Sequence, residues 1–359
     1  MSAVTPTYFD LQGEFQSGHQ SERLKEFAAY YSNRMSYEEV SQLLERMTGA
    51  SSMSDQTICE MVIEKSCQVS AAVKAQLAKE QERSQPGVLA INPQVDIYDP
   101  EVKEVLLFDD AILVKEQAET RQKKSSSTNE EVCEKKESTP FVATDVVLLQ
   151  TPTNGFEYIT ETIDQDGETL VPFNTIVQSR ILSHYPDPSP LNIVAITDGA
   201  KTIRTRLLSI FGGVVVLILD WYHLRKKVRA MMSMIACNKE EKALHIREIL
   251  RLLWRGKVSE SLEYLNTQVN VKNQKRLQDL TGYITKHQQE IIDYGARQKA
   301  GKTIGSGRGE KAVDQVIGKR QKKKGMSWSK KGSKALGILK VVELNQKWDE
   351  LWFPQEEAA

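Results

Sequence analysis

Residues 102–115 read VKEVLLFDDAILVK, and this stretch carries the strongest indication of the fold. Its Val, Leu and Ile residues predict a β-strand that only the adjacent Asp109 and Asp110 interrupt. A carboxylate inside such a strand costs free energy unless a metal ion or another partner neutralises it. Successive side chains point to opposite faces of a strand, so only one of the two acids can join a functional site. The alternative is an aspartate at a strand edge or bulge that faces solvent.

The elements after this strand follow a definite order. Residues 141–150 and 156–163 predict two more strands, joined by the turn Pro152-Thr-Asn-Gly155. The remaining elements are a helix at 173–185, a buried strand at 192–197, a helix at 200–211 and a strand at 214–219. Three antiparallel strands followed by helix, strand, helix and strand is the order of an RNase H-like mixed α/β sheet, although many α/β sheets begin similarly.

The segment before the strands has a helical pattern. Apolar residues recur at helical spacing from residue 21 to about residue 82. Ser36 and Glu39 match a capping box, and Gly49 ends the helix that Ser36 opens. A helix, a short Gly/Ser turn and another helix over 36–65 predict a helix-turn-helix that reads DNA through a major groove. An ordinary three-helix bundle fits the same pattern.

Composition divides the chain into five segments. They are a flexible tail at 1–21, an all-α helix-turn-helix domain at 22–86, an RNase H-like core at 98–235 with a charged loop at 117–140, a helical insertion at 236–294, and a segment at 295–345 that holds a glutamate helix and a basic, DNA-contacting stretch.

The composition also excludes several classes of protein. The four cysteines lie far apart and form no C-x-x-C pair, which argues against disulfide and zinc frameworks. The longest apolar run, residues 214–219, is too short to cross a membrane, which needs about 20 residues. The N-terminus lacks the pattern of a signal peptide. We therefore expect a cytoplasmic protein without a membrane partner.

The distribution of charge indicates the substrate. The chain has 48 basic and 48 acidic residues, yet residues 297–340 contain 14 Lys and Arg and only two acids, Glu310 and Asp314. A basic segment around an acidic site is typical of a protein that binds a phosphate backbone, although a charge run is more often only a solvated surface. The candidate DNA contacts are Lys319, Arg320, Lys322, Lys323, Lys324, Lys330 and Lys331.

Further acids complete a candidate metal site. Phosphodiester chemistry with two divalent ions needs carboxylates from separate elements, and Mg²⁺ prefers oxygen ligands. Asp198 follows the buried strand at 192–197, where ligand groups gather in open α/β sheets, and Glu310 follows a Gly-rich turn. Each has a structural alternative, Asp198 as a helix N-cap and Glu310 as a first-turn glutamate. Asp220 and His223 at the end of the last strand are candidate supporting residues or a structural pair.

Several of these motifs occur together in one known family. The ordered motifs ITDGA (196–200), LDWYH (219–223), YGAR (294–297), IGSG (304–307) with Glu310, and GMSWS (325–329) resemble the ISKra-type insertion-sequence transposases. These are bacterial DDE enzymes similar to eukaryotic Mutator-like transposases. The resemblance covers roughly residues 20–350. Family members usually have Asp-Gly at the first acid, where this chain has Asp110-Ala111.

The resemblance implies a function for these residues. Asp110, Asp198 and Glu310 would be the catalytic acids that hold Mg²⁺ or Mn²⁺, as two ions, with Asp109 as the competing choice for the first acid. The expected reaction is cleavage of double-stranded DNA at the terminal inverted repeats and strand transfer into target DNA by a homo-oligomer. The alternatives are an RNase H-like nuclease or resolvase, and an inactivated transposase that only binds DNA.

Overall fold

The computed structural model describes residues 20–83, 89–117 and 140–354. The predicted tail at 1–21 and charged loop at 117–140 fall almost entirely outside the described residues. The predicted order of strands and helices is confirmed over the rest of the core, and the fold is a mixed α/β architecture around a five-stranded sheet.

The sheet is mixed, with the predicted strand β1 at its centre. The strands are β1 (Val105–Lys115), β2 (Phe141–Gln150), β3 (Phe156–Thr160), β4 (Ile193–Thr197) and β5 (Val216–Leu219). Their order is β3-β2-β1-β4-β5. Strands β1, β2 and β3 pair antiparallel, whereas β4 lies parallel to both β1 and β5. The carboxyl ends of β4 and β5 therefore meet beside the middle of β1.

Helices cover both faces of the sheet. One face carries α5 (Phe173–His184) and α6 (Lys201–Phe211), and a 3₁₀ turn (Gly212–Val214) leads from α6 to β5. The other face carries α12 (Gly307–Val313), a π-helical turn (Asp314–Gly318), α13 (Lys319–Gln321) and α14 (Lys330–Leu344). Alternate residues of β1 enter the two cores: Leu107 packs with the α5–α6 side, and Phe108 with the α12–α14 side.

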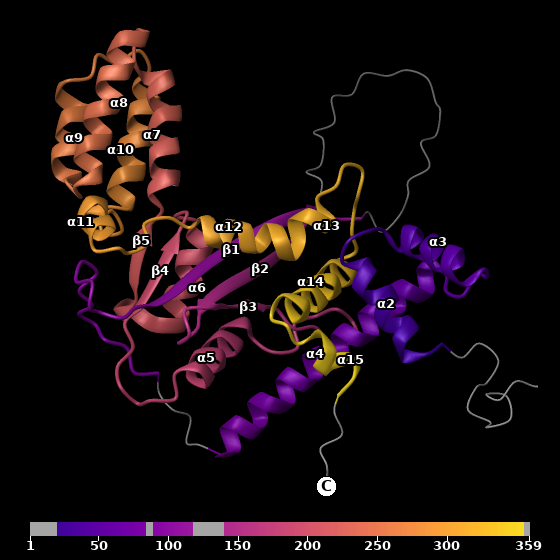
Figure 1. The fold of residues 1–359 in the computed structure, drawn as a ribbon. Coiled ribbons are helices and arrows are strands. Elements are labelled where there is room, and N and C mark those ends of the chain that lie inside the picture. The colour runs from indigo at the N-terminus through magenta and orange to yellow at the C-terminus, as the bar shows by residue number, and fades with distance from the viewer. Residues whose placement is uncertain (1–19, 84–88, 118–139, 355–359) are drawn as a thin grey trace, which may run out of the picture.

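A helical bundle separates β5 from α12. It consists of α7 (Trp221–Ile235), α8 (Lys239–Trp254), α9 (Val258–Thr267) and α10 (Gln274–Lys286), and α11 (Tyr294–Lys299) leads back to the sheet. The bundle projects from the end of the sheet where β5 lies (Figure 1). Trp221, Trp254 and Tyr294 pack against one another at its base, where Tyr294 is buried.

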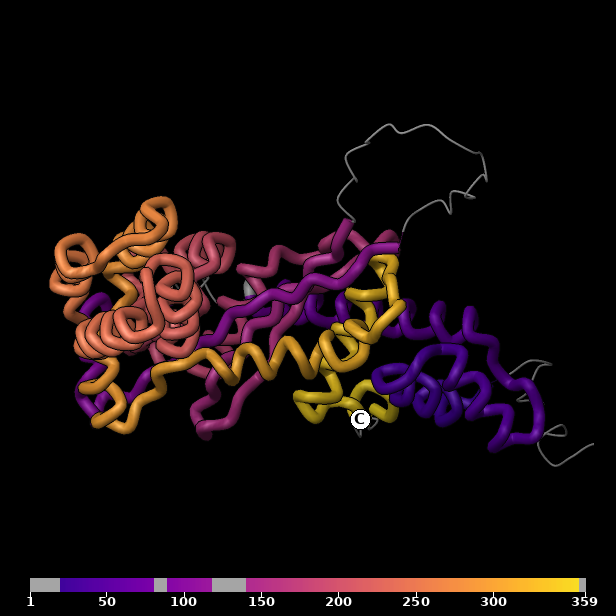
Figure 2. The backbone as a smooth tube through the Cα atoms, turned by 90° about the horizontal axis from the view of Figure 1, so that it is seen from above, coloured from indigo at the N-terminus to yellow at the C-terminus, as the bar shows by residue number. Residues whose placement is uncertain are grey.

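The N-terminal helices lie at the opposite end of the molecule from the bundle (Figure 2). They are α2 (Glu22–Ser32), α3 (Tyr37–Thr48) and α4 (Asp55–Arg83), and α15 (Trp348–Trp352) lies near them. The capping box of Ser36 and Glu39 is confirmed, and Gly49 ends α3 in a left-handed conformation. Helix α4 is longer than the predicted third helix and packs along α14. No helix in the described residues is both long enough and apolar enough to span a membrane.

Candidate active site

The two neighbouring aspartates of β1 have separate environments. Asp109 is buried on the α6 face, where Arg206 donates to it from Nε at 2.8 Å and from Nη2 at 2.5 Å. Arg206 also pairs with Asp145 of β2 at 2.5 Å. Burial raises the pKa of Asp109 to about 6, and the contacts with Arg206 oppose that rise. Asp109 is therefore part of a buried ion pair and lies on the sheet face opposite to Asp110.

Asp110 lies on the α12 face and is half-buried. Its Oδ1 accepts a hydrogen bond from the backbone N–H of Ala111 at 2.8 Å. Burial raises the pKa of Asp110 to about 6, the hydrogen bond from Ala111 lowers it, and the charges of Asp198 and Glu310 raise it further. The three predicted acids are thus near enough to one another for their charges to interact.

Asp198 lies in the turn between β4 and α6. Its Oδ1 accepts a hydrogen bond from the N–H of Ala200 at 2.8 Å, and Ala200 occupies the N-cap position of α6. Asp198 is therefore not the N-cap of that helix. Gly199 has φ of +85°, a left-handed conformation that favours glycine. The left-handed turn lets the chain leave β4 with the Asp198 side chain at the edge of the sheet.

Glu310 lies in the first turn of α12, with 54% of its side chain exposed. Helix α12 approaches β1 closely because Gly309 faces Phe108: a Cβ at position 309 would lie 3.0 Å from the Cβ of Phe108. His223 Nε2 lies 3.3 Å from Glu310 Oε1. The glycine contact and this histidine together hold Glu310 on the same side of the sheet as Asp110.

Asp220 and His223 connect β5, α7 and the turn before α12. Asp220 is buried and accepts four hydrogen bonds, from the N–H groups of Tyr222, His223 and Ser306 and from the Ser306 hydroxyl. Burial acts to raise the pKa of Asp220, but these hydrogen bonds outweigh it and lower that pKa. His223 Nδ1 lies 3.4 Å from Asp220 Oδ2. Asp220 thus has a structural role, and His223 stands between it and Glu310.

The three acids offer oxygen ligands to a metal ion. Among the described residues, no three His, Cys, Asp or Glu side chains are gathered closely enough to hold an ion as they stand. The donor chemistry of Asp110, Asp198 and Glu310 nevertheless fits Mg²⁺ or Mn²⁺, because carboxylates supply only oxygen ligands. Burial and, to a smaller extent, the charges of Asp198 and Glu310 raise the pKa of Asp110, and a divalent cation would offset both effects. The three side chains must move closer together to share an ion.

The predicted DNA-contacting residues have different environments. Lys319, Lys322, Lys323 and Lys324 are exposed. Arg320 is buried: its Nε donates to the carbonyl of Ser32 at 2.8 Å, and its guanidinium stacks on Trp328. Lys330 pairs with Glu168 at 3.0 Å, and Lys331 donates to the carbonyl of Gln165. The exposed basic surface is therefore smaller than the sequence predicts, and Arg320 is a structural residue.

The N-terminal helices present an acidic surface. The exposed acids of α3 and of the first half of α4 are Glu38, Glu39, Glu45, Asp55, Glu60 and Glu64. Arg46 is the one basic residue in the sequence from 37 to 64. A helix that enters a DNA groove must approach phosphates, so this surface is unfavourable for that contact. It favours the alternative interpretation of these helices as a three-helix bundle.

Sequence reasoning missed two groups of residues near the acids. Arg206 neutralises Asp109, and His287 with Glu290 lies behind the Asp198 turn, where Nδ1 of the histidine is 2.6 Å from the glutamate. The spacing of His287 and Glu290 is visible in the sequence, but nothing there indicates that this segment returns to the sheet.

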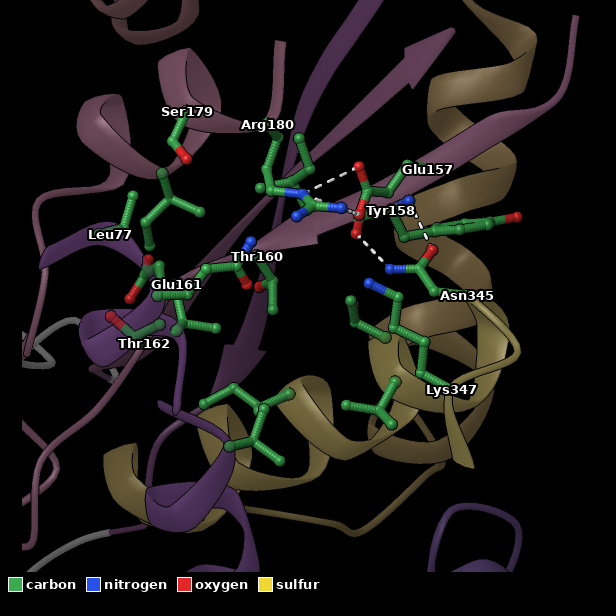
Figure 3. Close-up of a pocket in the computed structure, with 18 residues that line it drawn as sticks. Leu77, Glu157, Tyr158, Thr160, Glu161, Thr162, Ser179, Arg180, Asn345 and Lys347 are labelled. Atoms are coloured by element: carbon green, nitrogen blue, oxygen red, sulfur yellow. Dashed lines mark hydrogen bonds and ion pairs between the residues drawn. The ribbon is translucent and has the colours of Figure 1, made fainter. Parts of the chain in front are cut away.

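A cavity of about 150 Å³ lies beside β3 and is lined by residues of β3, α4, α5 and α14 (Figure 3). Arg180 and Glu157 form an ion pair at its rim, at 2.6 Å. Asn345 accepts from the N–H of Tyr158 and donates to its carbonyl, both at 2.8 Å, which covers the open edge of β3. The three acids do not line this cavity, so it is separate from the candidate active site.

Part of the chain matches the profile of a protein family. Residues 177–350, just under half of the chain, match the profile of an uncharacterised protein family, UPF0236. This region contains Asp198, Glu310 and the whole helical bundle. The chain matches no curated protein and no solved structure.

Proposed function

We propose that this chain is a DNA transposase with an RNase H-like core, which cleaves DNA at the ends of a mobile element and joins them to target DNA. The observation that carries the proposal is that Asp110, Asp198 and Glu310, from three separate elements, lie near enough for the charges of Asp198 and Glu310 to act on Asp110. The strand order, with three antiparallel strands and two further strands parallel to the first, is consistent with such a core.

Each acid has a defined part in this proposal. Asp110, Asp198 and Glu310 would hold two divalent ions, which would supply the Lewis acidity that phosphodiester chemistry needs. Asp110 projects from the middle of β1, and the N–H of Ala200 orients Asp198. His223, next to the fully hydrogen-bonded Asp220, restrains Glu310 from the other side. The reaction is hydrolysis that leaves a 3′-OH, followed by in-line attack of that hydroxyl on target DNA.

The basic surface would bind the DNA backbone. Lys319 and Lys322 to Lys324 are exposed and follow α12 after the π-helical turn at Asp314–Gly318, so a phosphate chain bound there could extend along α12 toward Glu310. The reading of terminal repeats by α3 and α4 stays a prediction, and their acidic surface disfavours it. We also expect the enzyme to act as a homo-oligomer on its DNA, in the cytoplasm.

Glu310→Gln tests the proposal. It should abolish strand transfer and leave DNA binding intact, because the amide keeps the shape of the side chain but loses the charge. The matched control is Asp314→Asn, which removes the other acid of the basic segment and should retain activity. Strand transfer by the Glu310→Gln variant would contradict the assignment.

Two alternatives predict different products. An RNase H-like nuclease or resolvase would cut DNA but would not join a pre-cut 3′-OH end to a target. An inactivated transposase would bind DNA without metal-dependent cleavage. Inverted repeats and short direct duplications in the DNA that flanks the gene would support a mobile element.

A further inference from the structure

His287 lies at the end of the helical bundle, directly behind the turn that carries Asp198. Its side chain is 1% exposed. A Cβ at Gly199 would lie 2.9 Å from His287 Cε1 and 3.2 Å from Nε2, so the ring packs against this glycine. The left-handed turn of Gly199 and the histidine therefore fit together, and a side chain at position 199 would displace the ring.

Glu290 fixes the orientation of this histidine. His287 Nδ1 lies 2.6 Å from Glu290 Oε2, and because an ionised carboxylate only accepts, Nδ1 is the donor. Nε2 then faces the Gly199 side. It is buried and has no hydrogen-bond partner among the described residues. An unsatisfied buried nitrogen is costly, so its position here calls for a physical reason.

The pair is also tied to the elements that form the site. Arg204 of α6 places Nη1 3.1 Å from Glu290 Oε1, although the two groups are not aligned for a hydrogen bond. The carbonyl of Glu290 accepts from the N–H of Leu219, the last residue of β5. Tyr283 packs on the histidine ring at 4.8 Å between centroids. The bundle therefore contacts β5, α6 and the Asp198 turn through two buried residues.

We propose that His287 and Glu290 are positioning residues: through the packing of the ring on Gly199, they hold the turn that aims Asp198 at the site. This inference rests on the proposed function for its catalytic consequence. It assigns the bundle a direct role in the geometry of the active site.

The substitution His287→Asn tests this role. Asparagine can keep an N–H for Glu290 but removes the ring and Nε2 from the Gly199 turn. The matched control is His245→Asn, because His245 is also buried in the bundle and bonded at Nδ1, to the Tyr264 hydroxyl at 2.9 Å. Glu290→Gln is a second variant of the same pair, with the original side-chain shape.

The first readout is hydrogen exchange of residues 197–200, which does not need an active enzyme. His287→Asn should raise hydrogen exchange of this turn about fivefold. Without the ring that packs on Gly199, the Gly199 and Ala200 amides should open to solvent more often. Glu290→Gln should raise it less, and His245→Asn should leave it unchanged. Unchanged exchange in both His287→Asn and Glu290→Gln would overturn the inference.

The second readout is the turnover of metal-dependent DNA cleavage, with DNA affinity measured alongside. Turnover should fall about tenfold in His287→Asn at unchanged affinity, a size typical of residues that orient a ligand group. Equal losses in His287→Asn and His245→Asn, in proportion to their stability, would overturn the positioning role. Absence of cleavage by the unaltered protein would count against the proposed function, while the exchange measurement still decides the inference.

Discussion

At the scale of single residues, the neighbours Asp109 and Asp110 have separate environments on opposite faces of β1. Strand alternation predicts from the sequence alone that they lie on opposite faces. It does not predict which face holds the site, because the partner of Asp109 is Arg206, on a helix 97 positions later. The structure separates their environments: Asp109 is ion-paired, whereas Asp110 is half-buried within reach of the charges of two other acids.

Substitution of the two aspartates should therefore have opposite effects. In Asp109→Asn, the largely buried Arg206 loses its main charged partner. We therefore expect the free energy of unfolding to fall by about 2–3 kcal/mol. Asp110→Asn removes a repelled charge and should leave stability unchanged or slightly raised, while DNA cleavage is lost. Urea denaturation and a cleavage assay measure the two effects. Equal destabilisation by both changes would contradict the separation of roles.

The raised pKa of Asp110 also predicts a dependence of stability on pH. Its pKa is about 6 in the folded protein and near 3.8 without the surroundings of the fold, so the folded chain binds this proton more tightly. Stability due to this group is thus lost as pH rises from about 4 to about 6. The free energy of unfolding of Asp110→Asn minus that of the unaltered protein should rise by about 1–2 kcal/mol over this interval, after allowance for partial exposure. A difference in free energy of unfolding that stays constant over this pH interval would contradict the prediction.

At the scale of elements, the position of Glu310 depends on how closely α12 approaches β1. The sequence predicts the strands and helices of the core to within a few residues, because their apolar periodicity is regular. It does not predict the contact between Gly309 and Phe108, which joins segments 201 positions apart in the chain. The Gly-rich stretch before Glu310 is visible in the sequence, but its function as a contact surface is not.

Substitution of Gly309 tests this contact. A Cβ there would lie 3.0 Å from the Phe108 Cβ, so Gly309→Ala should push α12 away from β1 and reduce cleavage. Gly307→Ala is the control, since nothing lies within 4 Å of a Cβ at that position. Both glycines lie in the first turn of α12, so the change in helix propensity is of the same kind in the two variants and the contact with Phe108 distinguishes them. Equal activity of the two variants would show that the approach of α12 does not matter.

At the scale of the whole molecule, segments distant in sequence build one body. The sequence predicts an N-terminal helical segment, a core and a helical insertion, but α4 extends to Arg83 and packs along α14. Local periodicity carries no information about such pairing of distant helices. For the same reason, the basic run at 319–331 predicts a charged surface, whereas Arg320 is buried against Ser32 and Trp328.

The exposed lysines should determine how DNA binding depends on salt. Replacing Lys322, Lys323 and Lys324 by alanine should weaken binding and reduce the slope of log affinity against log salt by about 0.9 per lost phosphate contact, or about 2–3 in total. Lys330→Ala is the control, because Lys330 is paired with Glu168 and should change the slope less. Filter binding at several salt concentrations measures the slope. An unchanged slope in the triple variant would place the DNA elsewhere.

The most direct test of the central claim is the joining of a pre-cut DNA end to a target. The unaltered protein is mixed with Mg²⁺, a target plasmid and a labelled duplex that ends in the repeat flanking the gene, with its 3′-OH exposed. We predict that label enters the plasmid, and that neither Glu310→Gln nor a reaction without divalent ions gives this product. Cutting without joining, or joining by Glu310→Gln at the rate of the unaltered protein, would contradict the account.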